Sequence, residues 1–273
     1  MGEHHQARLL LAAVQQRWDE YDRLAAHEPP APEPFLRLAR EADVLPWLHA
    51  RLAESGRLAR TGPIDQALAR ARQKVRHDNL LLVARAETAL DLLLGARVVP
   101  VALKGLDALH RLYPQFDLRT VDDVDLLLRF EQLEPALAAL EGAGWRVASD
   151  AARTHFVRSS HHLPLTAPGP IPVELELHWS LAQEQRFHVD PAGLIARALP
   201  LDVGGRSVLR LEDHDAATHL LLHHFTHYFD RRLKWLLDLV ALAGQPGFDW
   251  ERVVGRAREW GAAAACGFAL VHL

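Results

Sequence analysis

The sequence predicts an α+β fold in which a central α+β core is flanked by helical regions. Two observations carry this prediction. Residues 98–129 read as strand, turn, helix, loop and strand, whereas both ends of the chain show the apolar spacing of helices. A chain of 273 residues can hold one large or two small domains. We expect an N-terminal helical region at 1–95, the core at 96–205 and a C-terminal helical region at 206–273.

Helical spacing dominates the N-terminal region. It predicts one helix over Gln6–Leu24, a break over the proline-rich stretch 27–34, and one or two short helices over Phe35–Ala53. After a Gly-Pro pair at 62–63, we expect a long helix over Ile64–Gly95. The region is therefore predicted to be a set of helices packed on the core.

The core begins with a short apolar run, Val98–Leu103, whose β-branched start is typical of a buried strand. Lys104 and Gly105 end this strand, and residues 106–113 then follow helical spacing. A second strand is expected over Val121–Leu128. The unit therefore places a tight turn and a helix between two strands.

Two acidic residues, Asp123 and Asp125, lie near the start of the second strand. Residues at i and i+2 of a strand point to the same face, so the two carboxylates project together, roughly 6–7 Å apart. Two like charges side by side are costly unless a cation lies between them, and Mg²⁺ prefers such oxygen ligands. The pair therefore indicates a metal site that also binds substrate phosphates.

Beyond this strand, Glu131–Gly142 reads as an amphipathic helix and Trp145–Val147 as the start of another strand. A turn rich in proline separates Phe156–Leu165 from Val173–Trp179, and we expect these two segments to form a hairpin. In the C-terminal third, a helix is expected over Asp213–Phe229.

The alternation in Val173–Trp179 places Glu174, Glu176 and His178 on one strand face. This pattern is also typical of a strand that simply shows its polar face to solvent. Beside the aspartate pair, however, one of the two glutamates can supply the third carboxylate of a two-metal site, which clamps the attacking and leaving oxygens of a phosphoryl displacement.

These motifs resemble the uncharacterised nucleotidyltransferase family of the polymerase-β-like superfamily. The likeness spans roughly residues 79–238 and rests on Leu103-Lys104-Gly105, Arg119, Asp123-Val124-Asp125-Leu126-Leu127, Glu176-Leu177-His178-Trp179 and the helical segment Arg232–Asp238. The resemblance implies a small mixed sheet with helices, Mg²⁺ (or Mn²⁺), and transfer of a nucleoside monophosphate from an NTP such as ATP.

The resemblance also assigns residues. Asp123 and Asp125 match the metal-binding pair, and Glu176 matches the third carboxylate, so these three are the expected catalytic and metal-binding residues. The nucleotide-contacting residues are expected to be Lys104, Gly105, Arg119, His178 and Lys234. Where the superfamily has Gly-Ser or Gly-Gly, this chain has Gly105 followed by leucine, and Lys104 can replace the missing serine hydroxyl as a point charge on phosphate.

Composition narrows the class of protein. The net charge of −4 and the isoelectric point near 6.5 give no support for broad nucleic-acid binding. The single cysteine, Cys266, rules out a disulfide framework and lies among small residues typical of a packed helix. No signal peptide and no apolar run of membrane-spanning length is recognisable. We therefore expect a cytoplasmic protein without a membrane partner.

Two other functions stay open. His219, His223 and His227 are spaced i, i+4, i+8 on one helix face, which would suit a zinc-dependent hydrolase, although the glutamate of a His-Glu-x-x-His helix is absent. The fold could also be kept as a non-catalytic binding or regulatory module within a biosynthetic gene cluster. If the chain is a transferase, the sequence leaves its acceptor open among a small molecule, a sugar, a peptide, a protein or an RNA end, with a hydroxyl or a phosphate as the attacking group.

Overall fold

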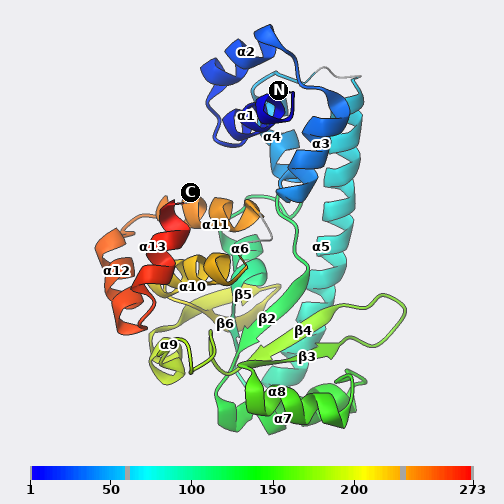
Figure 1. Ribbon diagram of the computed structural model, residues 1–273. Helices are drawn as coiled ribbons and strands as arrows, with labels where there is room; N and C mark the ends of the chain where they lie inside the picture. The colour runs from blue at the N-terminus through cyan, green and yellow to red at the C-terminus, as the bar shows by residue number, and fades with distance from the viewer. Residues whose placement is uncertain (1, 59–61, 228–231, 272–273) are drawn as a thin grey trace. The chain divides into compact units, whose positions relative to one another are not determined.

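The computed structural model describes residues 2–58, 62–227 and 232–271, which divide into two compact units (Figure 1). The first unit consists of Met1–Asn79, Gln115–Thr120 and Phe229–Trp235, and the second of Leu80–Pro114, Val121–Tyr228 and Leu236–Leu273. The described part of the chain contains no helix that is long and apolar enough to cross a membrane.

The first unit is helical, as the N-terminal pattern predicts. Its helices are α1 (Gly2–Val14), α2 (Trp18–His27), α3 (Pro32–Glu41), α4 (Leu45–Glu54) and the first half of α5 (Pro63–Gly95). Leu9, Phe35 and Leu48 are fully buried in it and come from α1, α3 and α4. The expected long helix and the two short helices before it are confirmed.

The prediction of a single helix over Gln6–Leu24 is wrong. The chain leaves α1 after Val14 and turns at Gln16, whose φ of 57° lies in the left-handed region, before α2 begins at Trp18. A helix cannot continue through a residue in this conformation, which is uncommon for a side chain other than glycine. The apolar spacing continues across the three residues between α1 and α2, so the sequence pattern does not reveal the break.

The second unit contains one six-stranded sheet in the order β3-β4-β2-β1-β6-β5. Its strands are β1 (Val101–Ala102), β2 (Asp123–Leu127), β3 (His162–Thr166), β4 (Glu174–His178), β5 (Leu199–Val203) and β6 (Arg206–Arg210). β2 pairs with β4 and β1 with β6 in parallel, whereas the other pairs are antiparallel. The mixed sheet with helical regions on both sides in sequence confirms the predicted α+β class.

The second unit also contains the second half of α5, which continues from the first unit, and the part of α11 (Lys234–Ala243) from Leu236 onward. Its other helices are α6 (Lys104–Arg111), the 3-10 turn η1 (Phe130–Gln132), α7 (Leu133–Gly142), α8 (Asp150–Ser159), α9 (Pro191–Arg197), α10 (Asp213–Thr226), α12 (Trp250–Glu259) and α13 (Ala263–Val271). The helix expected over Asp213–Phe229 is confirmed as far as Thr226, and residues 228 and 229 lie outside the described residues.

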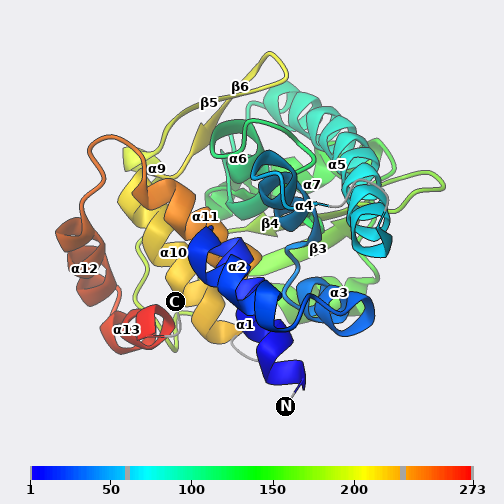
Figure 2. The same ribbon diagram turned by 90° about the horizontal axis from the view of Figure 1, so that it is seen from above.

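The C-terminal helices pack on one side of the sheet, and Figure 2 shows α10 between the sheet and the outer helices α12 and α13. Val101 of β1, Leu103 just after that strand, and Leu127 of β2 share a buried apolar cluster with residues of α10, α12 and α13. Cys266 of α13 belongs to this cluster, and burial raises the pKa of its thiol to about 11. The cysteine therefore packs in the core as a protonated thiol.

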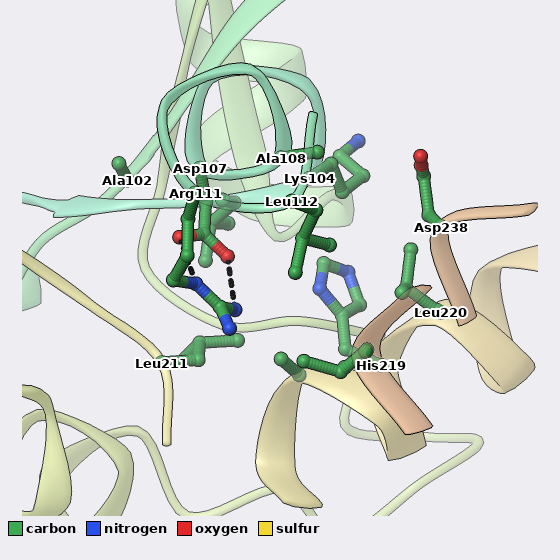
Figure 3. A pocket seen from close by; sticks show the side chains of 13 residues that line it. Ala102, Lys104, Asp107, Ala108, Arg111, Leu112, Leu211, His219, Leu220 and Asp238 are labelled. Atoms are coloured by element: carbon green, nitrogen blue, oxygen red, sulfur yellow. Dashed lines mark hydrogen bonds and ion pairs between the residues drawn. The ribbon is translucent and has the colours of Figure 1, made fainter. Parts of the chain in front are cut away.

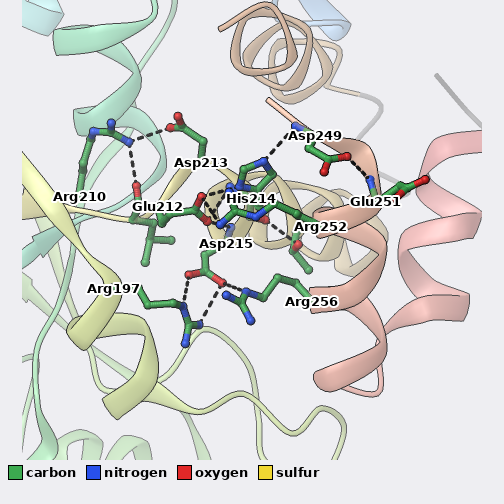
Figure 4. A network of polar contacts seen from close by, with 12 residues as sticks. Arg197, Arg210, Glu212, Asp213, His214, Asp215, Asp249, Glu251, Arg252 and Arg256 are labelled. Carbon is green, nitrogen blue, oxygen red and sulfur yellow. Dashed lines mark hydrogen bonds and ion pairs between the residues drawn. The ribbon is translucent and has the colours of Figure 1, made fainter. Parts of the chain in front are cut away.

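A buried ionic network fixes α10 against its neighbours (Figure 4). Asp215 of α10 is fully buried, and its carboxylate contacts Arg197 of α9 at 3.0 Å and Arg256 of α12 at 2.9 Å. A buried carboxylate requires such partners because desolvation of an unpaired charge is costly. The network therefore fixes the position of α10, which forms one wall of the candidate site.

The segment before β3 differs from the prediction. Residues 150–159 form α8, and the strand is confined to His162–Thr166, so the strand expected over Phe156–Leu165 is wrong for its first half. The strand expected over Trp145–Val147 is reduced to a single bridge between Arg146 and Thr166. The expected hairpin itself is confirmed, since β3 and β4 pair antiparallel.

The N-cap of α8 explains this difference and provides a test. The Ser149 hydroxyl accepts a hydrogen bond from the Ala152 backbone N–H at 3.1 Å, which satisfies one of the free donors of the first helical turn. We expect Ser149→Ala to lower the free energy of unfolding by about 1 kcal/mol, measured by urea denaturation. Ser149→Asp retains a capping oxygen and should lose less than half of that amount.

Candidate functional site

Two neighbouring strands bring the predicted carboxylates together. In the parallel pair of β2 and β4, Asp123 lies opposite Glu174 and Asp125 opposite Glu176. Because i and i+2 residues of a strand share a face, these carboxylates project from the same side of the sheet. The apolar residues between them, such as Val124 and Leu175, are fully buried on the other face.

Asp125 is the centre of the cluster. Its side chain is 1% exposed, and its Oδ1 lies 2.7 Å from Lys104 Nζ and 2.9 Å from His178 Nε2. Burial on its own would raise the pKa of Asp125, but Lys104 and the hydrogen bond from His178 hold it well below its ordinary value. Its second oxygen, Oδ2, is buried and has no hydrogen-bond partner among the described residues.

Lys104 reaches Asp125 from the corner between β1 and α6. Its φ of 40° is a left-handed conformation, which is strained for a side chain other than glycine. The preceding residue, Leu103, donates its N–H to the Asp125 carbonyl at 3.0 Å, which fixes the corner against β2. Burial opposes the charge of Lys104, but the carboxylates of Asp125 and Asp123 outweigh it and raise its pKa.

Asp123 differs from its partner. Burial, followed by repulsion from Asp125, raises the pKa of the Asp123 carboxyl to about 6, and Lys104 offsets this only in part. The two aspartates therefore differ in charge around pH 5, where Asp125 is ionised and Asp123 carries a proton. Such separated pKa values in adjacent carboxyls are a frequent feature of functional sites.

Three histidines extend the cluster along β4 and β3. His178 Nε2 contacts Glu176 Oε2 at 3.1 Å as well as Asp125, and His162 Nε2 lies 3.5 Å from Glu176 Oε1. Although burial opposes its charge, these hydrogen bonds raise the pKa of His178. Burial lowers the pKa of His162 and lowers that of His161 to about 3, so both rings are neutral at pH 7.

Sequence reasoning gave His161 and His162 no role. Their place in the site depends on the hairpin register, which sets His162 directly opposite His178. Because that register depends on the length of the turn, it cannot be predicted from the sequence of either strand alone.

The cluster forms the floor of a cleft of about 410 Å³ within the second unit. The walls come from the loop after β4 and from α10, and the lining includes Lys104, Asp123, His161, His162, Glu176, His178, Arg186, Phe187, His219, His223 and His227. A volume of this size is typical of small-molecule sites, and the few polar groups converge on its floor.

The predicted histidine face of α10 therefore belongs to the same cleft. Burial, followed by the charge of Lys104, lowers the pKa values of His219 and His223 well below the ordinary value, so both rings are neutral. Figure 3 shows His219 and Lys104 on the wall of a small adjoining cavity next to α6. In the part of the chain that the structure describes, the close groups of potential metal ligands do not include these α10 histidines.

The remaining predicted contacts are placed as follows. Gly105 is the second residue of α6 and is buried. Arg119 and Lys234 belong to the first unit, where both are buried near Thr120. Arg119 Nη1 donates to the Thr120 carbonyl at 2.8 Å, whereas Lys234 Nζ donates to the Thr120 hydroxyl at 3.2 Å and lies 2.7 Å from Asp43. Their contact with a triphosphate stays a prediction.

The residues present fit a divalent cation. Asp125, Glu176 and His178 can each offer a ligand atom within 4.8 Å of the other two. The unpartnered Asp125 Oδ2 is the kind of hard oxygen ligand that Mg²⁺ prefers, and a buried carboxylate oxygen without any partner is unusual unless a ligand completes it.

The chain is similar in structure to solved structures of known proteins. The solution structure of the antibiotic-resistance factor ANT(2'')-Ia shares 16% identity and a TM-score of 0.50, covering 71% of this chain and 97% of that chain. A crystal structure of ANT(2'')-Ia in complex with adenylyl-2''-tobramycin shares 14% identity and a TM-score of 0.47, covering 64% of this chain and 97% of that chain. At 16% identity the first likeness shows the fold alone.

None of the curated proteins compared with the chain matches it. The sequence profile described as "Uncharacterised nucleotidyltransferase" matches residues 28–273, which extends the likeness in both directions beyond residues 79–238. Because the match covers most of the chain, this protein belongs to the uncharacterised nucleotidyltransferase family.

Proposed function

We propose that this nucleotidyltransferase moves a nucleoside monophosphate from an NTP to an acceptor hydroxyl or phosphate in the cleft above Asp125. The observation that carries the proposal is that Asp125, Glu176 and His178 each offer a ligand atom within 4.8 Å of the other two, while Asp125 keeps a buried second oxygen, Oδ2, without a hydrogen-bond partner among the described residues. Asp123, Asp125 and Glu176 would hold Mg²⁺ or Mn²⁺. When bound, such a cation supplies positive charge to the reacting phosphate and to the leaving pyrophosphate.

Lys104 and the amino end of α6 are the proposed phosphate contacts of the second unit. Lys104 Nζ already lies 2.7 Å from Asp125 and lines the cleft, so one ammonium can bind both the carboxylate and a phosphate oxygen. The first turn of α6, which includes Gly105, carries the backbone N–H groups that a helix leaves free at its amino end. Arg119 and Lys234 remain proposed contacts to the triphosphate.

The acceptor would approach from the cleft and attack the α-phosphorus in line with the leaving pyrophosphate. Its class stays open among small molecules, sugars, peptides and proteins. A cytoplasmic location, where NTPs are available, is part of the proposal. Glu176 lies closer to the developing chemistry than Glu174, because Glu176 contacts both His178 and His162, whereas Glu174 is exposed at the start of β4.

Matched glutamine variants test which glutamate serves. We expect Glu176→Gln to lower kcat on the order of 10²-fold, because a neutral amide cannot supply the negative charge of a carboxylate that binds a metal ion. Glu174→Gln should change kcat by less than about threefold. Steady-state release of pyrophosphate measures both variants, and a larger loss in Glu174→Gln would assign the third carboxylate to Glu174 instead.

Isothermal titration calorimetry tests the proposed donor site directly. All four NTPs are titrated into the full chain with and without Mg²⁺, and binding of at least one NTP that requires Mg²⁺ is expected. Asp125→Asn should weaken that Mg²⁺-dependent binding. If no NTP binds under any condition, the transfer proposal fails and the non-catalytic binding module becomes the better account of the fold.

A further inference from the structure

Three histidine side chains lie close together in one corner of the cleft. His161 precedes β3, His162 begins β3, and His178 ends β4, where the antiparallel register places it opposite His162. The ring centroids are 4.9 Å apart for His161 and His162, 5.1 Å for His162 and His178, and 5.7 Å for His161 and His178. Three imidazoles thus meet at one end of a hairpin.

We propose that His161, His162 and His178 form a binding site for a divalent transition-metal ion such as Zn²⁺. Each ring offers a nitrogen within 4.8 Å of the nitrogens of the other two. Nitrogen ligands at about 2.0–2.1 Å from a tetrahedral Zn²⁺ lie roughly 3.3 Å from one another, so small ring rotations complete the site. All three residues line the cleft, which leaves a fourth position open to water or to a ligand oxygen.

A second observation points to a ligand at this corner. The Nδ1 atoms of His161 and His178 are buried and have no hydrogen-bond partner among the described residues. His178 is 3% exposed, and its other nitrogen, Nε2, is held by Asp125 and Glu176. Metal-binding imidazoles usually have their second nitrogen bound to a carboxylate in this way, because that contact fixes the ring and increases its basicity.

The ligand chemistry separates this site from the proposed Mg²⁺ site. Imidazole suits Zn²⁺ and other transition metals, whereas Mg²⁺ prefers carboxylate, phosphate and water oxygens. Glu176 contacts both His162 and His178, so a cation among the rings also has a negative charge beside it. The inference rests on the three rings and does not require that the protein transfer a nucleotide.

Cobalt substitution provides a spectroscopic test that is independent of activity. The full chain is freed of metal with a chelator and titrated with Co²⁺, and the visible absorption of tetrahedral cobalt is followed. We expect one equivalent to bind, Zn²⁺ to displace it, and millimolar Mg²⁺ to leave it in place. His161→Gln and His162→Gln should each weaken Co²⁺ binding at least about tenfold.

Matched variants guard against indirect effects. His155→Gln removes an exposed histidine of α8 and should bind Co²⁺ as the wild type does. Thermal unfolding by circular dichroism shows whether each glutamine variant is folded, and if one is not, the other decides. Wild-type affinity in the folded variants, or displacement of Co²⁺ by Mg²⁺, would overturn the site. NTP calorimetry on the same samples reports separately on the proposed transfer.

Discussion

Asp125→Asn should lower kcat of nucleotide transfer on the order of 10³-fold or more, equivalent to about 4 kcal/mol of transition-state stabilisation. The amide has nearly the shape of the carboxylate but lacks its charge. Asp125 is the residue on which Lys104 and His178 converge, and its Oδ2 is the unpartnered oxygen of the proposed metal site. The substitution therefore removes a metal ligand and the partner of a buried lysine together.

The measurement is the rate of pyrophosphate release at saturating NTP and Mg²⁺, so that weaker binding of the NTP does not contribute to the difference. Asp122→Asn is the matched control, because this exposed carboxylate precedes β2 and is not among the residues that line the cleft. The control should retain wild-type kcat within about threefold. Activity of Asp125→Asn within tenfold of the wild type would remove Asp125 from the catalytic assignment.

Local pattern was sufficient to predict the carboxylate pair but not the site around it. Asp123 and Asp125 share a face because strand periodicity is fixed, and no other part of the chain is needed to predict this. Their partners depend on pairing with distant strands. The parallel register that places Glu176 beside Asp125, and the hairpin register that places His162 beside His178, arise only in the folded sheet.

Errors in the predicted elements have similar causes. The strand expected over Phe156–Leu165 overlaps the last turn of α8, where Phe156 and Val157 have high strand propensity, whereas the serine that caps the helix, Ser149, lies outside that stretch. The hairpin of β5 and β6 was not predicted. Its turn is Gly204-Gly205, with both glycines at positive φ, and such a glycine pair is a local signal for a hairpin. In each case a turn or cap residue held the information that hydrophobic periodicity lacked.

Asp123→Asn should make the metal-free protein more stable at pH 8 while it impairs transfer. The Asp123 carboxyl has a pKa of about 6 in the folded protein, against an ordinary value of 3.8. As the pH rises through 3.8, the unfolded chain loses this proton while the folded protein keeps it up to about pH 6, so ionisation destabilises the fold. Above pH 6 the cost reaches at most about 3 kcal/mol, which the neutral amide avoids.

Urea denaturation of wild type and Asp123→Asn in the presence of a chelator measures this difference. The variant should gain up to about 3 kcal/mol in free energy of unfolding at pH 8. The gain should fall below about 1 kcal/mol at pH 4, which is close to the ordinary value of 3.8, because the carboxyl is then protonated in the folded protein and in many of the unfolded chains. Asp150→Asn, on an exposed residue of α8, should show no such gain. Equal stability of wild type and Asp123→Asn at pH 8 would mean that Asp123 ionises near its ordinary pKa. A gain that Mg²⁺ reverses, by stabilising only the wild type, would identify Asp123 as a carboxylate whose unfavourable charge is offset when a cation binds.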